Sequence, residues 1–143
     1  MSVPESTQQS VPMVALSWGE VVDKITILEI KQQRLSSAEA IDNVRRELAA
    51  LNKVVADAAV PDALAALKQS LKGVNEKLWD IENKIRAKES EGAFDRSFIE
   101  LARSVYVNND ERAKLKREIN KLLKSDLVEE KQYTAYAPSL TAV

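Results

Sequence analysis

Large aliphatic side chains recur at alternating spacings of three and four residues along much of this chain. The clearest run consists of Leu64, Leu67, Leu71, Val74, Leu78, Ile81 and Ile85. This spacing places the side chains in a narrow stripe on one face of an α-helix, as in coiled-coil-like packing. Similar runs cover residues 41–55 and 98–122. The pattern predicts an all-α protein in which long helices pack side by side.

The predicted fold is a four-helix bundle with helices at about residues 18–35, 38–59, 62–91 and 95–124. The sequence has only 3 Gly and 4 Pro, which favours few, long elements. A loop of about four residues makes the last two helices antiparallel, so a long helical hairpin dominates the bundle. We expect a bundle domain at residues 17–124, with a flexible tail at 1–16 and a partly docked tail at 125–143.

Side chains that cap helices mark most of these boundaries. Ser17 with Glu20, and Ser36 with Glu39, have the spacing of capping boxes. Asp62 and Asp95 are the expected N-caps of the third and fourth helices, and Gly92 is the expected stop of the third. Two tyrosines, Tyr133 and Tyr136, are expected to dock the second tail.

The helix predicted at residues 18–35 is apolar on two sides. Trp18, Val21, Val22, Ile25, Leu28 and Leu35 share one arc, whereas Ile27 and Ile30 lie on the opposite side. A helix of this kind is usually buried between neighbours. We expect the arc to pack on the long hairpin, and Ile27 and Ile30 to meet either the helix at 38–59 or a second subunit. These two residues are the basis for predicting a homodimer.

The sequence contains neither histidine nor cysteine. This excludes zinc sites with histidine or thiolate ligands, di-iron sites with histidine ligands, and catalysis by serine or cysteine with histidine. We therefore expect no cofactor and no metal site. The net charge is −1, so no global field attracts nucleic acid or membranes. The short apolar run at 11–16 contains a proline and resembles neither a signal peptide nor a membrane span, so a cytoplasmic protein is expected.

The stripe of the fourth helix is interrupted by polar residues. In the antiparallel hairpin, Asn108 faces Leu78 and Arg112 faces Val74. An arginine at such a position must be paired or reach solvent, because an unpaired buried charge is unfavourable by several kcal/mol. Glu29 lies within the apolar arc of the first helix and needs a cation for the same reason. The candidate polar pocket consists of Glu29, Asn75, Trp79, Glu82, Arg86, Arg103, Asn109, Asp110 and Arg112.

Three interpretations of this polar group are open. It could be a structural network that sets the register of the helices, as single polar residues do in coiled coils. It could be a pocket for a small anion. Arg112 could also simply extend to solvent.

Two other features have ordinary explanations. The acid pairs Glu20-x-x-Asp23 and Glu39-x-x-Asp42 resemble those of all-α Mg²⁺ enzymes, but they lie in first turns at opposite ends of the bundle, where helix dipoles favour acids. The basic stretch at 111–124 has no interleaved aromatic residues for stacking on bases, so nucleic acid is an unfavoured partner.

Three stretches resemble a bacterial family of small helical proteins of unknown function. They are residues 17–31, the run Leu78-Trp79-Asp80-Ile81-Glu82-Asn83-Lys84-Ile85-Arg86, and residues 98–120 with Asn109-Asp110-Glu111-Arg112. The resemblance covers residues 15–136 and implies that Glu82, Arg86, Asn109, Asp110 and Arg112 are the characteristic polar residues of the family. Its relatives tend to be encoded near glycosyltransferases and other surface-polysaccharide enzymes. Asn83 stands where a sister family has an acid, which weakens any metal or acid–base role there.

The expected function is that of a helical interaction or accessory protein, non-enzymatic and homodimeric, with a possible protein partner in an envelope-glycan pathway that the resemblance alone implies. The main alternative is a cofactor-free enzyme or small-anion binder, similar in style to the all-α chorismate mutases. Arg86, Arg103 and Arg112 would then hold the anion, with Glu82 or Glu29 as acid or base. A nucleic-acid binder that uses the basic helix is the third reading.

Overall fold

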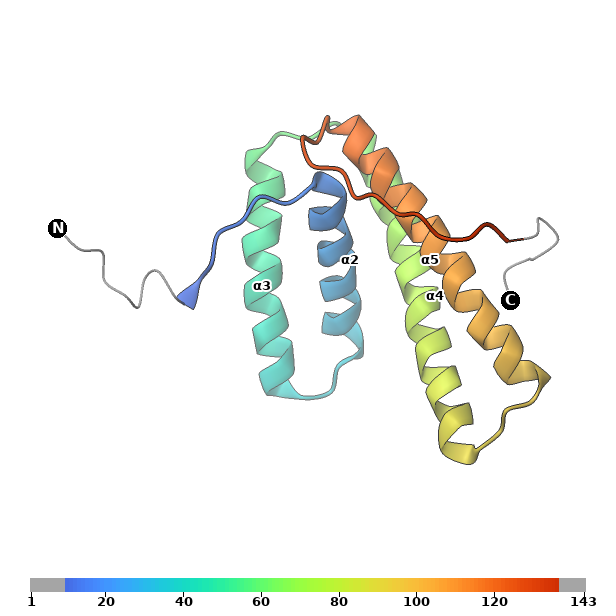
Figure 1. The fold of residues 1–143 in the computed structure, drawn as a ribbon. Coiled ribbons are helices and arrows are strands. Elements are labelled where there is room, and N and C mark those ends of the chain that lie inside the picture. Colours follow the sequence, from blue (N-terminus) through green and yellow to red (C-terminus); the bar gives the residue numbers. More distant parts are fainter. Residues whose placement is uncertain (1–9, 137–143) are drawn as a thin grey trace.

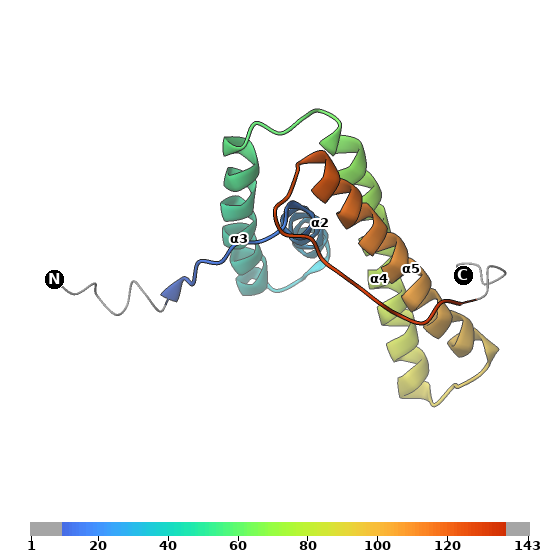
Figure 2. The same ribbon diagram turned by 45° about the horizontal axis from the view of Figure 1, so that its top comes forward.

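The protein is all-α over the residues that the computed structural model describes, 10–136, and its helices form the predicted bundle (Figure 1). They are α2 (Trp18–Arg34), α3 (Ala38–Asp57), α4 (Leu64–Glu91) and α5 (Arg96–Leu122). Two antiparallel hairpins, α2–α3 and α4–α5, lie beside each other, and the second is the longer (Figures 1 and 2). The outer parts of the two predicted tails, residues 1–9 and 137–143, lie outside the described residues.

The helix α2 is central, because it contacts each of the other three helices. One apolar cluster joins α2 to the long hairpin through Val22, Leu64, Leu71, Val74, Leu115 and Ile119. A second joins it to α3 through Val21, Ile25, Leu28, Val44 and Leu48. The residues of both clusters follow the three–four spacing seen in the sequence. The prediction that this helix is buried between neighbours is therefore confirmed.

The predicted assignment of the faces of α2 was partly wrong. Val21, Ile25 and Leu28 pack on α3 rather than on the long hairpin. Ile27 and Ile30 face α4 across a cleft, and Ile30 is only 1% exposed within the single chain. Turning the arc toward α3 brings the opposite side of α2 onto the hairpin. Ile30 is thus not available as an exposed oligomer face, and the homodimer stays a prediction without it.

Three of the predicted helix caps are present. Ser17 Oγ accepts a hydrogen bond from the Glu20 amide, and an Asp95 carboxylate oxygen accepts one from the Phe98 amide. Gly92 ends α4 in the left-handed region at φ 64°, which favours glycine.

Two predicted caps were wrong by one residue. Ser37, not Ser36, caps α3 by accepting from the Ala40 amide, because Ser36 lies in the extended link that joins α2 to α3. The helix α4 begins after Ala63 without a side-chain cap, so Asp62 does not cap it. The Asp62 backbone already lies in a turn that starts at Pro61, whose carbonyl accepts from the Leu64 amide at 3.1 Å.

The first turn of α2 rests directly on the end of α5. The Gly19 amide donates to Asn120 Oδ1 at 2.6 Å, and the Trp18 amide donates to Ser125 Oγ at 3.2 Å. Amides in a first turn have no partner within their own helix, so Asn120 of α5 and Ser125, just after α5, supply the acceptors. A Cβ atom at Gly19 would lie 2.5 Å from the Lys116 carbonyl oxygen, which explains why glycine is needed at this close approach.

The segment 125–136 returns along α5 (Figure 1). The buried Lys116 ammonium binds Glu20 of α2 and Glu129 of this segment, each at 2.9 Å. Further along, the rings of Tyr106 and Tyr136 lie 5.4 Å apart. One lysine therefore joins α5, the start of α2 and the C-terminal segment.

Candidate functional site

A buried ionic network joins α2, α4 and α5 at the level of the polar gap in the sequence. Asp23, which is 1% exposed, accepts two hydrogen bonds from Arg112, from Nε at 3.0 Å and from Nη2 at 2.5 Å. Asn75 Nδ2 donates to Asp23 Oδ1 and to Thr26 Oγ1, both at 2.9 Å. Thr26 in turn donates to the Asp23 backbone carbonyl. Arg112 is therefore paired, and α2 supplies its partner.

The identity of this partner was missed from the sequence. Asp23 was noted only as half of the Glu20-x-x-Asp23 pair and explained as a first-turn acid. Its spacing from Thr26 and Ile30 places it on the inner face of α2, as the same reasoning did for Glu29. That spacing was the available signal. The spacing does not show that this face of α2 is turned toward α5.

Two acids that lie near this level of α2 and α4, Glu29 and Glu76, are not part of the network. Glu29 binds Lys68 at 3.0 Å and Lys72 at 3.5 Å on α4, so its need for a cation is met outside the network. Glu76 is 3.9 Å from Arg34 at the end of α2. Both acids pair across the α2–α4 contact, and neither faces Arg112.

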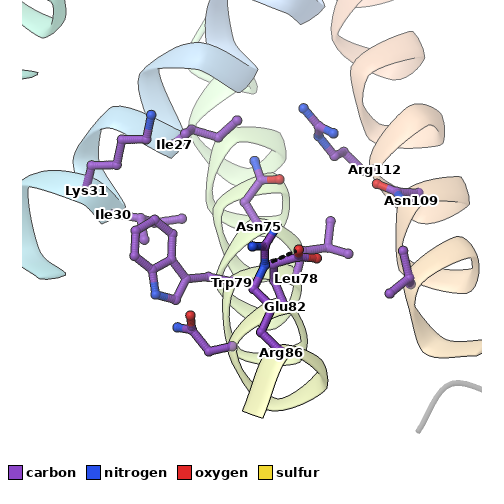
Figure 3. Close-up of a pocket in the computed structure, with 12 residues that line it drawn as sticks. Ile27, Ile30, Lys31, Asn75, Leu78, Trp79, Glu82, Arg86, Asn109 and Arg112 are labelled. Atoms are coloured by element: carbon purple, nitrogen blue, oxygen red, sulfur yellow. Dashed lines mark hydrogen bonds and ion pairs between the residues drawn. The ribbon is translucent and has the colours of Figure 1, made fainter. Parts of the chain in front are cut away.

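A cleft of about 480 Å³ opens next to the network, between α2, α4 and α5 (Figure 3). Its apolar lining consists of Ile27, Ile30, Leu78, Trp79 and Val105. Six of the nine residues of the predicted polar pocket line it, namely Asn75, Trp79, Glu82, Arg86, Asn109 and Arg112. Lys31 and Asn83 add to the polar lining and were not in the predicted set.

The remaining three predicted pocket residues do not line this cleft. Glu29 is held by its two lysines, and Arg103 is exposed on α5. Asp110 lines a separate cavity under the C-terminal segment. The predicted set therefore divides because Arg103 and Asp110 project from other sides of α5 than Arg112 does.

The cations of the cleft differ in how they are held. The hydrogen bond that Arg112 donates to Asp23, more than the charge of Asp23, raises the pKa of Arg112 and outweighs the effect of burial. Arg86 Nε binds Glu82 at 2.8 Å on the exposed surface of α4. Among the described residues, Lys31 has no ion-pair partner. In Figure 3, Lys31 and Arg112 stand on opposite sides of the cleft with Trp79 below them.

The neighbouring Lys116 belongs to the scaffold of the site rather than to the cleft. Burial lowers the pKa of its ammonium, but the hydrogen bonds that it donates to Glu20 and Glu129 outweigh this and raise the pKa overall. The same contact lowers the pKa of Glu129. In the basic stretch at 111–124, Arg112 and Lys116 form ion pairs with acids of α2. They are therefore not part of a free basic face.

No group of three or more acidic side chains in the described part of the chain could hold a metal ion. Of the two acid pairs noted in the sequence, Glu20 binds Lys116, Asp23 binds Arg112, and Asp42 lies 3.3 Å from Arg46. These acids have cationic side chains as partners. The cleft can therefore offer hydrogen-bond donors, positive charge and an aromatic surface.

Comparison with known proteins supplies a family but no activity. Residues 13–142 match the family of unknown function DUF6165. The chain belongs to this family. No curated protein and no solved structure matches the chain. Membership of DUF6165 agrees with the resemblance to a family of unknown function seen in the sequence. Among residues 10–136, none of the helices is long and apolar enough to cross a membrane.

Proposed function

We propose that this DUF6165 protein is a non-enzymatic accessory protein that binds a small anion in the cleft between α2, α4 and α5. The observation that carries the proposal is the placing of Lys31, which has no ion-pair partner among the described residues, across the cleft from the fixed Arg112. Both cations project beside Trp79 and other apolar side chains. A small anion with a ring or another apolar part matches this combination.

Arg112 can bind an anion although it is already paired. An arginine has five N–H donors, and Asp23 takes one from Nε and one from Nη2. The remaining donors are directed by a guanidinium that Asp23 holds in one orientation. Preorganised donors of this kind bind better than a free surface arginine, because less side-chain entropy is lost on binding.

Binding is favoured over catalysis by the surroundings of the acids. Glu82 is the carboxylate that lines the cleft, and it is an exposed residue bound to Arg86. The second acid considered for catalysis, Glu29, is held by Lys68 and Lys72 outside the cleft. General acid–base catalysis needs an ionisable group within hydrogen-bond reach of the reacting atoms, and the cleft supplies little beyond Glu82.

The sequence resemblance gives this proposal a cellular setting. The resemblance implies relatives that are encoded near surface-polysaccharide enzymes, so we propose a role in an envelope-glycan pathway, as a homodimer or with a protein partner. Phosphosugars and nucleotides are then the first anions to test. Sedimentation at micromolar concentration tests the dimer, and a compact monomer would contradict it.

The binding proposal is tested by calorimetric titration with glucose 1-phosphate and uridine monophosphate. We expect at least one of them to bind, and Lys31→Gln to weaken that binding about fivefold or more, because a charge-assisted hydrogen bond is lost. Lys77→Gln on the exposed face of α4 is the matched control, since Lys77 lines none of the cavities described and has no ion pair with any residue of 10–136. Binding that is unaffected by Lys31→Gln would contradict the proposal, as would the absence of binding.

A further inference from the structure

A second cavity lies on the other side of α5, beneath the C-terminal segment. Its volume is about 620 Å³, and it is formed between α5 and residues 131–136. Three tyrosines, Tyr106, Tyr133 and Tyr136, line it together with Lys131 and Asp110. This cavity is not part of the anion-binding cleft proposed above.

The two cavities meet at the same pair of side chains. Asn109 and Arg112, one helical turn apart on α5, line both of them. The cleft therefore lies on one side of this pair and the tyrosine-lined cavity on the other. A ligand that passes over Asn109 and Arg112 would place one part in each cavity.

Each cavity offers aromatic side chains, whereas the junction between the two cavities offers polar hydrogen-bond donors. Trp79 in the cleft and the three tyrosines in the second cavity offer flat surfaces on which rings stack. At the junction, Arg112 offers the guanidinium donors that Asp23 leaves free, and Asn109 offers an amide. Planar guanidinium donors suit phosphate oxygens. Each cavity lies within the usual range of about 300–1,000 Å³ for small-molecule sites.

We infer that the two cavities are halves of one site for an anion with two ring-bearing groups joined by a phosphate linkage, which crosses α5 at Asn109 and Arg112. The inference rests on the proposed anion-binding function and extends it to a ligand class. The C-terminal segment then forms one wall of the site. Its contacts with α5, Lys116 to Glu129 and Tyr106 to Tyr136, hold that wall in place.

The lining charges fit this class of ligand. The cleft contributes Lys31 and Arg86 against Glu82, and the second cavity contributes Lys131 against Asp110. Lys131 is loosely held, because its Nζ atom lies 3.9 Å from Glu129 and 5.9 Å from the centre of the Tyr133 ring. It is therefore free to turn toward an anion at the junction.

The test compares a two-ring probe with its halves by calorimetric titration of the full chain. UDP-glucose is the joined probe, and uridine monophosphate and glucose 1-phosphate are the halves. We expect UDP-glucose to bind at least tenfold more tightly than either half, because joining two groups makes the second contact intramolecular. Tyr133→Ala should remove most of this gain and leave the half that binds in the cleft unchanged, whereas Trp79→Leu should weaken that half as well.

The control variant changes a residue of the same segment that lies outside both cavities. Tyr133 is 77% exposed, so its replacement is expected to leave the fold intact, and Leu127→Ala changes an exposed residue of the same segment outside both cavities. If UDP-glucose binds no more tightly than the better half, or if Tyr133→Ala has no effect, the two-cavity site is wrong while anion binding in the cleft stands. If none of the three compounds binds, both proposals are wrong.

Discussion

At the scale of single residues, Asp23 is the residue that links α2 to the polar group of α5. Its carboxylate is buried, and Arg112 and Asn75 satisfy it from two other helices. A buried carboxylate is unfavourable without such partners, and a buried pair contributes more to the choice of one arrangement than to net stability. Asp23 thus favours the arrangement in which its face of α2 meets α5, and it orients Arg112 in the cleft.

We predict that Asp23→Asn destabilises the protein by about 2 kcal/mol, because it leaves the partly buried Arg112 without a counter-charge. Urea unfolding followed by circular dichroism measures the change. The matched control is Asp80→Asn, which removes an exposed partner of Arg34 and should change stability by less than about 0.5 kcal/mol. Equal effects of the two substitutions would show that the buried pair has no special role.

At the scale of helices and segments, the contacts between elements depend on close backbone approach and on anchoring side chains as well as on the apolar stripes. The helix α2 reaches α5 at Gly19, where the backbones almost touch, while Gly73 in α4 faces open space. The two glycines look alike in the sequence, since both lie inside predicted helices. Only the neighbouring helix distinguishes them.

The two glycines are therefore expected to respond in opposite ways to alanine. Gly19→Ala should destabilise by about 1–3 kcal/mol, because its Cβ would overlap the backbone of α5. Gly73→Ala should stabilise by about 0.5–1 kcal/mol, because alanine favours the helix and meets nothing within 4 Å. Thermal or urea unfolding of both variants is the measurement. A stabilised Gly19→Ala variant would refute the close contact.

The docking of the C-terminal segment is expected to depend on pH. The pKa of Glu129 is lowered in the folded protein, because its carboxylate accepts a hydrogen bond from Lys116. Its contribution to docking is thus complete above the ordinary carboxyl pKa and is lost as the pH falls through the lowered value. We predict that the segment leaves α5 as the pH falls below the ordinary carboxyl range.

This release can be followed by the nuclear magnetic resonance signals of the Tyr136 ring, which packs at a tilt against the Tyr106 ring in the docked state. Glu129→Gln should reproduce at neutral pH the shift seen in acid. Glu130→Gln changes an exposed neighbour that has no ion pair within the part of the chain that the structure describes, and it should not produce this shift. Signals that stay unchanged between pH 7 and pH 3 would contradict the anchoring role of Glu129.

At the scale of the whole molecule, two hairpins are united by one shared helix. The helix α2 is the meeting point of both apolar clusters, and the ionic network lies beside it. The helix α3 and the α4–α5 hairpin each bury apolar side chains against α2. The helix α2 is shorter than α4 and α5 (Figure 1), and the cleft lies between the second half of α2 and the long hairpin.

We therefore expect the protein to unfold in a single transition. The two tryptophans report on different parts, Trp18 on the start of α2 and Trp79 on the middle of α4. The variants Trp18→Phe and Trp79→Phe each leave one reporter, whose fluorescence should change over the same range of urea concentration as the helix signal of that variant. Separate transitions for the two reporters would show that the hairpins are independent units.

The sequence alone determined the helices, their order and most of their ends, because three–four spacing and capping depend only on residues that are close together in the sequence. It also located a polar group on the fourth helix, since Arg112 interrupts an otherwise apolar stripe. Tertiary structure decided what the sequence left open: that Asp23 is the partner of Arg112, that Ile30 is covered within one chain, and that six of nine predicted residues share a cleft. Each of these depends on how α2 is rotated about its axis. That rotation is set by the combined packing of residues far apart in the chain, which no local pattern contains.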